Sequence, residues 1–130
     1  MVTVLIHSDS RYPVNRKVVR QAVLDTFRQN KMGNIDAEVS IAVVGQRKMK
    51  AICQKYLEDE KVHEILTFSL EDVEGKRFIN PPDGILYLGD VVLCWPKVLL
   101  AASEDALMVN SELAFLVSHG TLHLIGKHHE

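Results

Sequence analysis

The stretch AEVSIAVVG, residues 37–45, places the strongest constraint on how this chain can fold. It is nearly continuous in apolar residues, so both alternating sets of its side chains favour burial. A run of this kind is typical of a strand that lies in the middle of a sheet. Gly45 breaks the run. We therefore expect 37–45 to be a central, buried strand.

Segments typical of strands and helices alternate around this stretch. Residues 2–8, VTVLIHS, are apolar and rich in β-branched side chains, which predicts a strand. Apolar residues recur at helical spacing over 14–31 and 46–60, which predicts two amphipathic helices. The remaining expected elements are strands at 64–70 and 84–95, the second interrupted at Gly89-Asp90, and a helical stretch over 96–125 that forms one helix or two with a break near 103–110. This order predicts an α+β domain, close to α/β, in which a mixed four-stranded sheet is packed with helices.

Length and composition narrow the class of protein. We expect residues 1–130 to form a single domain, with 47% hydrophobic and 25% charged residues. The net charge of −2 provides no general attraction to nucleic acid, so an RNA partner would need a local basic patch. The first residues do not resemble a signal peptide, and no apolar run is long enough for a membrane span. We expect a cytoplasmic protein without a membrane partner; its oligomeric state does not follow from the sequence.

Histidines are concentrated at the end of the chain, in HGTLHLIGKHHE, residues 119–130. His119 and His123 are four residues apart in a helical stretch, so they lie one turn apart on one face. Gly126 is placed where that helix would end, which would let His129 return toward the pair. Three imidazoles with an open fourth position are the ligand set of a catalytic zinc ion. We expect one Zn²⁺ ion bound by His119, His123 and His129, although Ni²⁺ also accepts imidazole ligands.

His128 adds a neighbouring imidazole, which is a solvent-facing residue, a substitute ligand or a proton shuttle. The spacing H-x-x-x-H-x-x-G-x-x-H also occurs in metzincin proteases, where a glutamate after the first histidine is the general base. Gly120 occupies that position here and cannot take a proton. The pattern therefore disfavours an ordinary peptidase and leaves the activation of water mainly to the metal.

The segment HGTLHLIGKHH resembles the signature H-G-x-L-H-L-x-G-x-D-H of the YbeY family. The likeness covers most of the chain. ILTFSL (65–70) and LGDVVLC (88–94) resemble the family segments V-L-S/T-F-P and L-G-D-I-V-I-S, and VSIAVVG (39–45) and KMKAICQKY (48–56) match the strand and helix before them. Where the family carries an arginine after its tyrosine, this chain has Leu57.

The resemblance implies a zincin-like metal site on the C-terminal helix, with His119, His123 and His129 as the catalytic zinc ligands. It also implies a zinc-dependent, single-strand-specific endoribonuclease. Such an enzyme acts in maturation of the 3′ end of 16S ribosomal RNA and in ribosome quality control, with the small ribosomal subunit as its partner.

Other polar residues could assist RNA cleavage. His63 is a candidate catalytic acid or base if it folds over the metal site; otherwise it is a loop histidine in solvent. Arg47 and Lys50, in the helix expected at 46–60, are candidate RNA-binding residues or part of an ordinary solvated face. Asp90 is a candidate to orient a ligand histidine, or simply part of a turn.

Two other classes of function remain open. One is a metal-dependent hydrolase of another substrate, peptidase-like in its metal site. The other is a non-catalytic, ribosome-associated factor stabilised by its metal, which Leu57 motivates.

Overall fold

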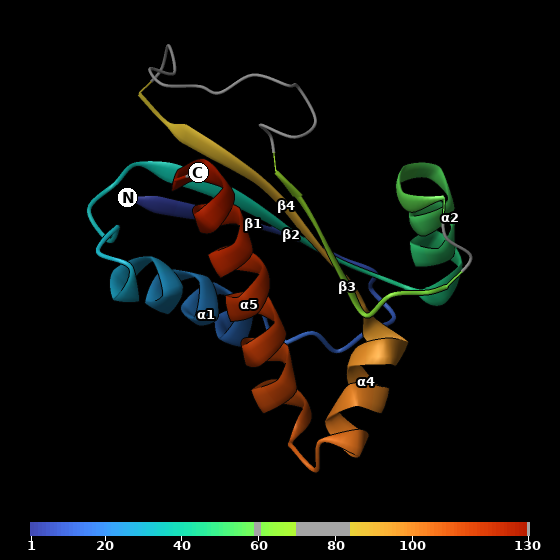
Figure 1. The fold of residues 1–130 in the computed structure, drawn as a ribbon. Helices are drawn as coiled ribbons and strands as arrows, with labels where there is room; N and C mark the ends of the chain where they lie inside the picture. Colours follow the sequence, from blue (N-terminus) through green and yellow to red (C-terminus); the bar gives the residue numbers. More distant parts are fainter. Residues whose placement is uncertain (59–60, 70–83, 130) are drawn as a thin grey trace.

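The computed structural model describes residues 1–58, 61–69 and 84–129, with side chains described as far as Gly126 in the final helix. The elements are, in order, β1 (Val2–Ser8), α1 (Arg16–Gln29), β2 (Ala37–Val44), α2 (Gln46–Leu57), β3 (Ile65–Ser69), β4 (Leu86–Cys94), α4 (Trp95–Glu104) and α5 (Val109–His129). They form an α+β structure, with a four-stranded sheet and four helices in the described ranges (Figure 1). None of the helices described is long and apolar enough to cross a membrane.

The sheet is mixed, as predicted, and its strand order is β1-β2-β4-β3. β2 pairs in parallel with both β1 and β4, whereas β3 pairs antiparallel with β4. Val39 and Ile41 on one face of β2 are fully buried, and Val44 on the other face is 7% exposed. The prediction of a central, buried strand at 37–45 is therefore confirmed.

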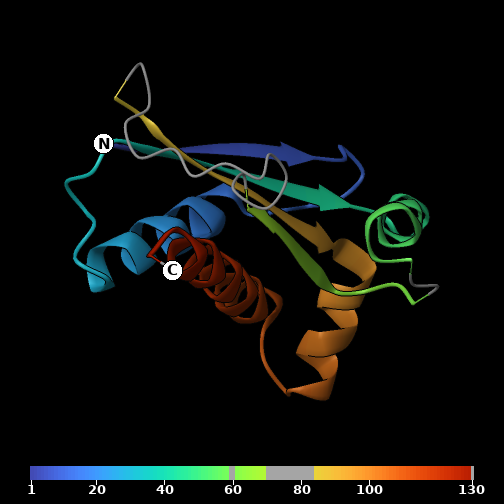
Figure 2. The same cartoon turned by 45° about the horizontal axis from the view of Figure 1, so that its top comes forward.

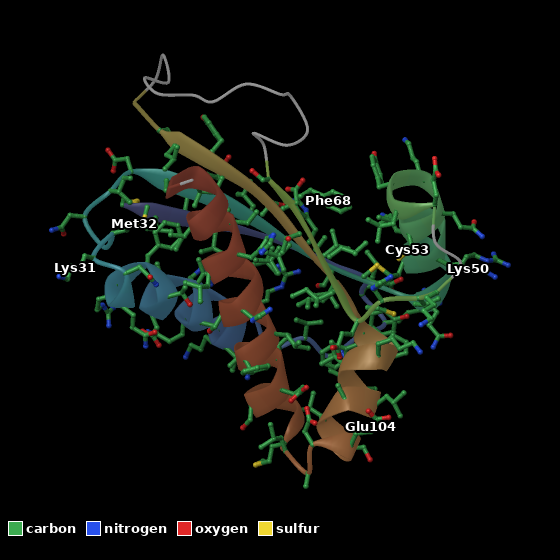
Figure 3. All side chains as sticks on the ribbon, viewed as in Figure 1. Lys31, Met32, Lys50, Cys53, Phe68 and Glu104 are labelled. Carbon is green, nitrogen blue, oxygen red and sulfur yellow. The ribbon has the colours of Figure 1, made fainter. Side chains whose placement is uncertain are left out.

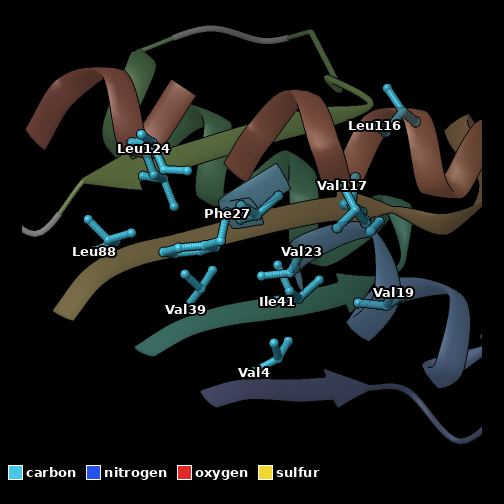
Figure 4. Close-up of a cluster of buried hydrophobic side chains, with 14 of the residues drawn as sticks. Val4, Val19, Val23, Phe27, Val39, Ile41, Leu88, Leu116, Val117 and Leu124 are labelled. Carbon is cyan, nitrogen blue, oxygen red and sulfur yellow. The ribbon is translucent and has the colours of Figure 1, made fainter. Parts of the chain in front are cut away.

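Helices cover the two faces of the sheet unequally (Figures 1 and 2). α1 and α5 pack side by side on one face, where Phe27, Ile41 and Leu124 belong to the main core (Figure 4). Each large side chain buried there stabilises the fold by about 1.5–3 kcal/mol. α2 packs on the opposite face, where Met49 and Cys53 meet Val92; Figure 3 shows Cys53 between α2 and the sheet.

Local signals explain where the helices begin and end. α1 begins after Asn15, whose side chain accepts a hydrogen bond from the Val18 N–H at 3.2 Å. The stretch expected over 96–125 is two helices, and the break at 105–108 falls inside the predicted interval. The helix end predicted at Gly126 is wrong, because α5 continues to His129. Leu124 and Ile125, which are 1% and 3% exposed, hold this part of α5 against the core.

The interruption predicted at Gly89-Asp90 is a β-bulge. Glu38 pairs with Tyr87 and Val39 with Gly89, so Leu88 is an extra residue in β4. Gly89 has a φ of +135°, and a Cβ there would lie 2.0 Å from the carbonyl oxygen of Phe68. Only glycine fits this position.

Candidate functional site: a histidine pair on the final helix

His119 and His123 lie on the outer face of α5 and are both exposed. Their spacing places them one turn apart on the same face, as predicted. The exposed ring of Phe115, one turn before His119, stacks on its imidazole with a centroid distance of 6.2 Å and an interplanar angle of 20°. Two imidazoles presented in this way fit two neighbouring coordination positions of one metal ion.

Gly120, next to His119 in the sequence, is buried and faces the sheet. A Cβ on Gly120 would lie 2.8 Å from Val91 Cγ1 and 3.1 Å from Ile65 Cδ1. The absent side chain therefore lets α5 approach β3 and β4 closely. A carboxylate at this position would be forced into the core, so position 120 cannot supply a general base to the histidine pair.

The third predicted ligand, His129, is kept away from the pair because α5 is a continuous helix. α5 runs through Gly126 to His129, and the side chains of His128 and His129 lie outside the described ones. Ten residues of continuous helix separate the Cα atoms of His119 and His129 by about 15 Å along the axis. Three ligands could therefore converge only if the chain left the helix after His123.

Gly126 is the residue at which such a departure is easiest. A Cβ on Gly126 would meet nothing within 4 Å, so packing does not require a glycine there. Glycine inside a helix costs about 1 kcal/mol relative to alanine. The residues present thus fit a metal through His119 and His123, and Gly126 provides a weak point from which His129 can move.

His63 lies in the short segment before β3 and is half-buried. This segment is fixed to the end of β4, because the Cys94 N–H donates to the carbonyl of Glu64 at 3.0 Å. Among the side chains the structure describes, no three histidines, cysteines or acidic residues gather closely enough to bind one metal ion. His63 therefore does not complete a ligand set with His119 and His123.

The role considered for Asp90 is wrong. Asp90 is exposed, and its neighbour Val91 points toward Gly120 of α5. Successive side chains of a strand point to opposite faces, so Asp90 lies on the face of the sheet away from α5. It cannot accept a hydrogen bond from either histidine of the pair.

Arg47 and Lys50 are exposed on α2 and border a shallow hollow of about 570 Å³ with Gln46, Gln54 and Val62. Because α2 and α5 cover opposite faces of the sheet, these cations and the histidine pair are separated by its thickness (Figure 1). β3 is an edge strand of the sheet, next to β4.

The end of α2 reaches that edge. Tyr56 meets Phe68 of β3 edge-on, with ring centroids 5.1 Å apart. Leu57, which replaces the arginine of the resembled family, is 46% exposed beside it.

Two residues near the histidine pair were missed by the sequence interpretation. Phe115 precedes His119 by four residues, and that spacing was the available signal for the ring contact. Glu112 lies one turn earlier still; it is 2% exposed, and its Oε2 has no hydrogen-bond partner among the described residues. Burial, and then the neighbouring Asp105, raise the pKa of Glu112 above its ordinary value of 4.5.

The fold and the site together define an α+β domain that presents a pair of imidazoles on its final helix. Comparison with known proteins then identifies the family: the model described as endoribonuclease YbeY matches residues 7–130. An endoribonuclease YbeY from Roseiflexus castenholzii is 34% identical over 117 residues, which cover 90% of this chain and 72% of that protein. Another from Dehalococcoides mccartyi is 28% identical and covers 99% of this chain and 84% of its own. The chain belongs to the YbeY endoribonuclease family, as the resemblance predicted.

A solved structure supports the fold independently. The solution structure of a Thermotoga maritima protein superposes with a TM-score of 0.60 at 23% identity, over 100% of this chain and 75% of that one. At this identity the likeness concerns the arrangement of strands and helices.

Proposed function

We propose that this chain is a zinc-dependent endoribonuclease that cleaves single-stranded RNA, with His119, His123 and His129 as the zinc ligands. Family membership supports the reaction class. The observation that carries the site is the exposed position of His119 and His123, one turn apart on a helix whose other side is packed on the sheet. The same ligand set would suit Ni²⁺.

The residues of the site have separable roles. A bound zinc ion would supply a hydroxide near neutral pH and a Lewis acid for a phosphoryl oxygen. His119 and His123, as neutral imidazoles, would each give one ring nitrogen to that ion. Phe115 restricts the orientation of the His119 ring by stacking on it. His63 remains a proposed acid or base, which would require its segment to move toward the pair.

His129 would complete the ligand set when the last turn of α5 leaves the helix at Gly126. Arg47 and Lys50 would hold RNA phosphates. The bound RNA would pass around the β3 edge of the sheet, from these two cations to the histidine pair. In the cell, we propose maturation of the 3′ end of 16S ribosomal RNA and ribosome quality control in the cytoplasm, with the small ribosomal subunit as partner.

A cleavage assay tests this proposal. Zinc-loaded protein is incubated with a single-stranded RNA, and His123→Ala is compared with Leu122→Ala, an exposed neighbour on the same helix. We expect His123→Ala to lose the bound zinc in elemental analysis and to lower the cleavage rate by about a hundredfold or more, whereas Leu122→Ala keeps both. Equal rates for the two variants would refute the proposal.

Leu57 favours one alternative, a ribosome-associated factor that keeps the metal for stability. In that case the zinc-loaded protein would not cleave RNA, and chelation would lower its melting temperature. A metal-dependent hydrolase of peptides or other substrates is the weaker alternative, because position 120 cannot carry a base. Chelator-sensitive cleavage of a peptide substrate would favour it.

A further inference from the structure

A second hollow lies at the carboxyl ends of β1 and β2, on the face of the sheet opposite the histidine pair. Its volume is about 740 Å³, within the usual range for small-molecule sites. Its lining includes Asp9, Arg11, Tyr12, Val44, Arg47 and Lys48. Figure 2 shows the arrowheads of β1 and β2 pointing toward α2, and residues from the start of α2 line this hollow.

The topology places a binding crevice at this point. The connection after β1 leads to α1 on one face of the sheet, and the connection after β2 leads to α2 on the other. The connections that follow two adjacent parallel strands therefore run to opposite faces of the sheet. Sheets of this kind bind ligands outside the carboxyl ends of the strands at which the connections diverge.

The charges around the hollow favour an anion. Asp9 is paired with Arg11, whose Nη2 and Nε donate to its two carboxylate oxygens at 2.7 and 3.0 Å. The Arg11 side chain and backbone N–H lower the pKa of Asp9 to about 2, so this pair stays ionised and mutually neutralised. Arg47 and Lys48 form no ion pair with any described residue. Two cations thus remain available to a phosphate group.

The walls of the hollow suit a flat ring. Val44 provides part of an apolar wall, and the half-buried ring of Tyr12 stacks on Trp95, with centroids 6.2 Å apart. The exposed Arg11 guanidinium lies 5.6 Å from the Tyr12 ring centroid, so a base at this ring would share it with a cation that can also stack. A Cβ on Gly45 would lie 2.6 Å from the Tyr12 hydroxyl oxygen, so the glycine lets Tyr12 lie against the start of α2. An aromatic side chain beside an apolar wall is the usual stacking surface for a nucleobase.

We propose that this hollow binds one nucleotide, with its base against Tyr12 and its phosphate against Arg47 and Lys48. The nucleotide is either a free mononucleotide or one residue of an RNA strand, since both present the same chemistry. Arg47 also borders the hollow on α2 where RNA phosphates are proposed to bind, but none of the lining residues belongs to the histidine pair, so binding here does not depend on zinc.

Titration of ¹⁵N-labelled protein by NMR tests the proposal. The probes are uridine 5′-monophosphate, uridine, inorganic phosphate and a short oligouridylate, the last added to His123→Ala so that cleavage does not intervene. We expect uridine 5′-monophosphate, the oligouridylate or both to move the amide signals of Gly45, Lys48 and Ala51, and to change the fluorescence of Trp95, the single tryptophan.

A matched pair of variants removes the same charge in two places. Arg47→Ala/Lys48→Ala should weaken binding by about tenfold or more, because two charge-assisted contacts are lost. Lys17→Ala/Arg20→Ala, on the exposed surface of α1, should leave it unchanged. Binding of the oligouridylate alone would indicate an RNA subsite, and equal binding of the mononucleotide would indicate a free nucleotide; both support the hollow.

Three results would overturn it: no binding of either nucleotide, equal affinity for inorganic phosphate and uridine 5′-monophosphate, or equal affinity in the two double variants. Each would leave the cleavage assay with His123→Ala unaffected, so the two proposals fail separately.

Discussion

Gly120→Ala tests the close approach of α5 to the sheet. Inside a helix this change should stabilise the fold by about 1 kcal/mol, because alanine has the higher helix propensity. Here the new methyl group would lie 2.8 and 3.1 Å from the two terminal carbons of Val91, a side chain that is fully buried. Overpacking of this kind costs about 1–3 kcal/mol. We therefore expect a net loss of up to about 2 kcal/mol in the free energy of unfolding.

The background Val91→Ala separates the two contributions. It removes both methyl groups that Gly120→Ala would strike and itself destabilises the fold by about 2 kcal/mol. Gly120→Ala should then become stabilising by up to about 1 kcal/mol, since only Ile65 Cδ1, at 3.1 Å, remains close. The predicted coupling between the two positions is about 1–3 kcal/mol.

Urea unfolding of the metal-free protein, followed by circular dichroism, measures all four forms with a common m value. Gly126→Ala is the matched control, because it makes the same change on the same helix where a Cβ meets nothing within 4 Å. It should stabilise the fold by up to about 1 kcal/mol in both backgrounds. If Gly120→Ala stabilises the original protein as much as Gly126→Ala does, the close contact between α5 and β4 does not exist.

Three further outcomes are expected. Gly126→Ala should also weaken zinc binding in a competition titration, because a firmer helix keeps His129 from the pair; unchanged affinity would contradict the proposed departure from the helix. Glu112→Gln should raise the urea midpoint at pH 8 but not at pH 4. The raised pKa of Glu112 gives stability that is fully present below 4.5 and lost as pH rises, and a pH-independent effect would refute this. Gly89→Ala should destabilise the fold by several kcal/mol in the same urea assay, because its Cβ would overlap the Phe68 carbonyl; a change below about 1 kcal/mol would contradict the bulge geometry.

The elements themselves could be predicted because their signals are local. Ala22, Val23 and Phe27 recur at helical spacing and lie on the buried side of α1, and Asn15 is an ordinary helix cap. Strand β1 was predicted with its observed bounds, 2–8, from its β-branched residues. The exposed histidine pair was predictable for the same reason, since a spacing of four residues fixes a shared helix face.

Other features depended on packing between elements distant in sequence. The end predicted at Gly126 failed because contacts of Leu124 and Ile125 outweigh the weak helix propensity of one glycine. From the sequence, Gly120 is the position where a catalytic base is missing, whereas in the structure its missing side chain leaves room for Val91. The hollow at the carboxyl ends of β1 and β2 depends on which face of the sheet each connection crosses to. No local pattern in the sequence predicts that face.

The bulge in β4 determines which of the side chains after it face the core. The same core cluster contains Leu86 and Leu88 before the bulge and Val91 and Leu93 after it. The side chains that face the core are therefore at even positions before the extra residue and at odd positions after it. In a strand that alternated strictly from Leu86, Asp90 would face α5 in place of Val91. The extra residue therefore lets β4 bury leucines at even positions and apolar residues at odd positions on one and the same face.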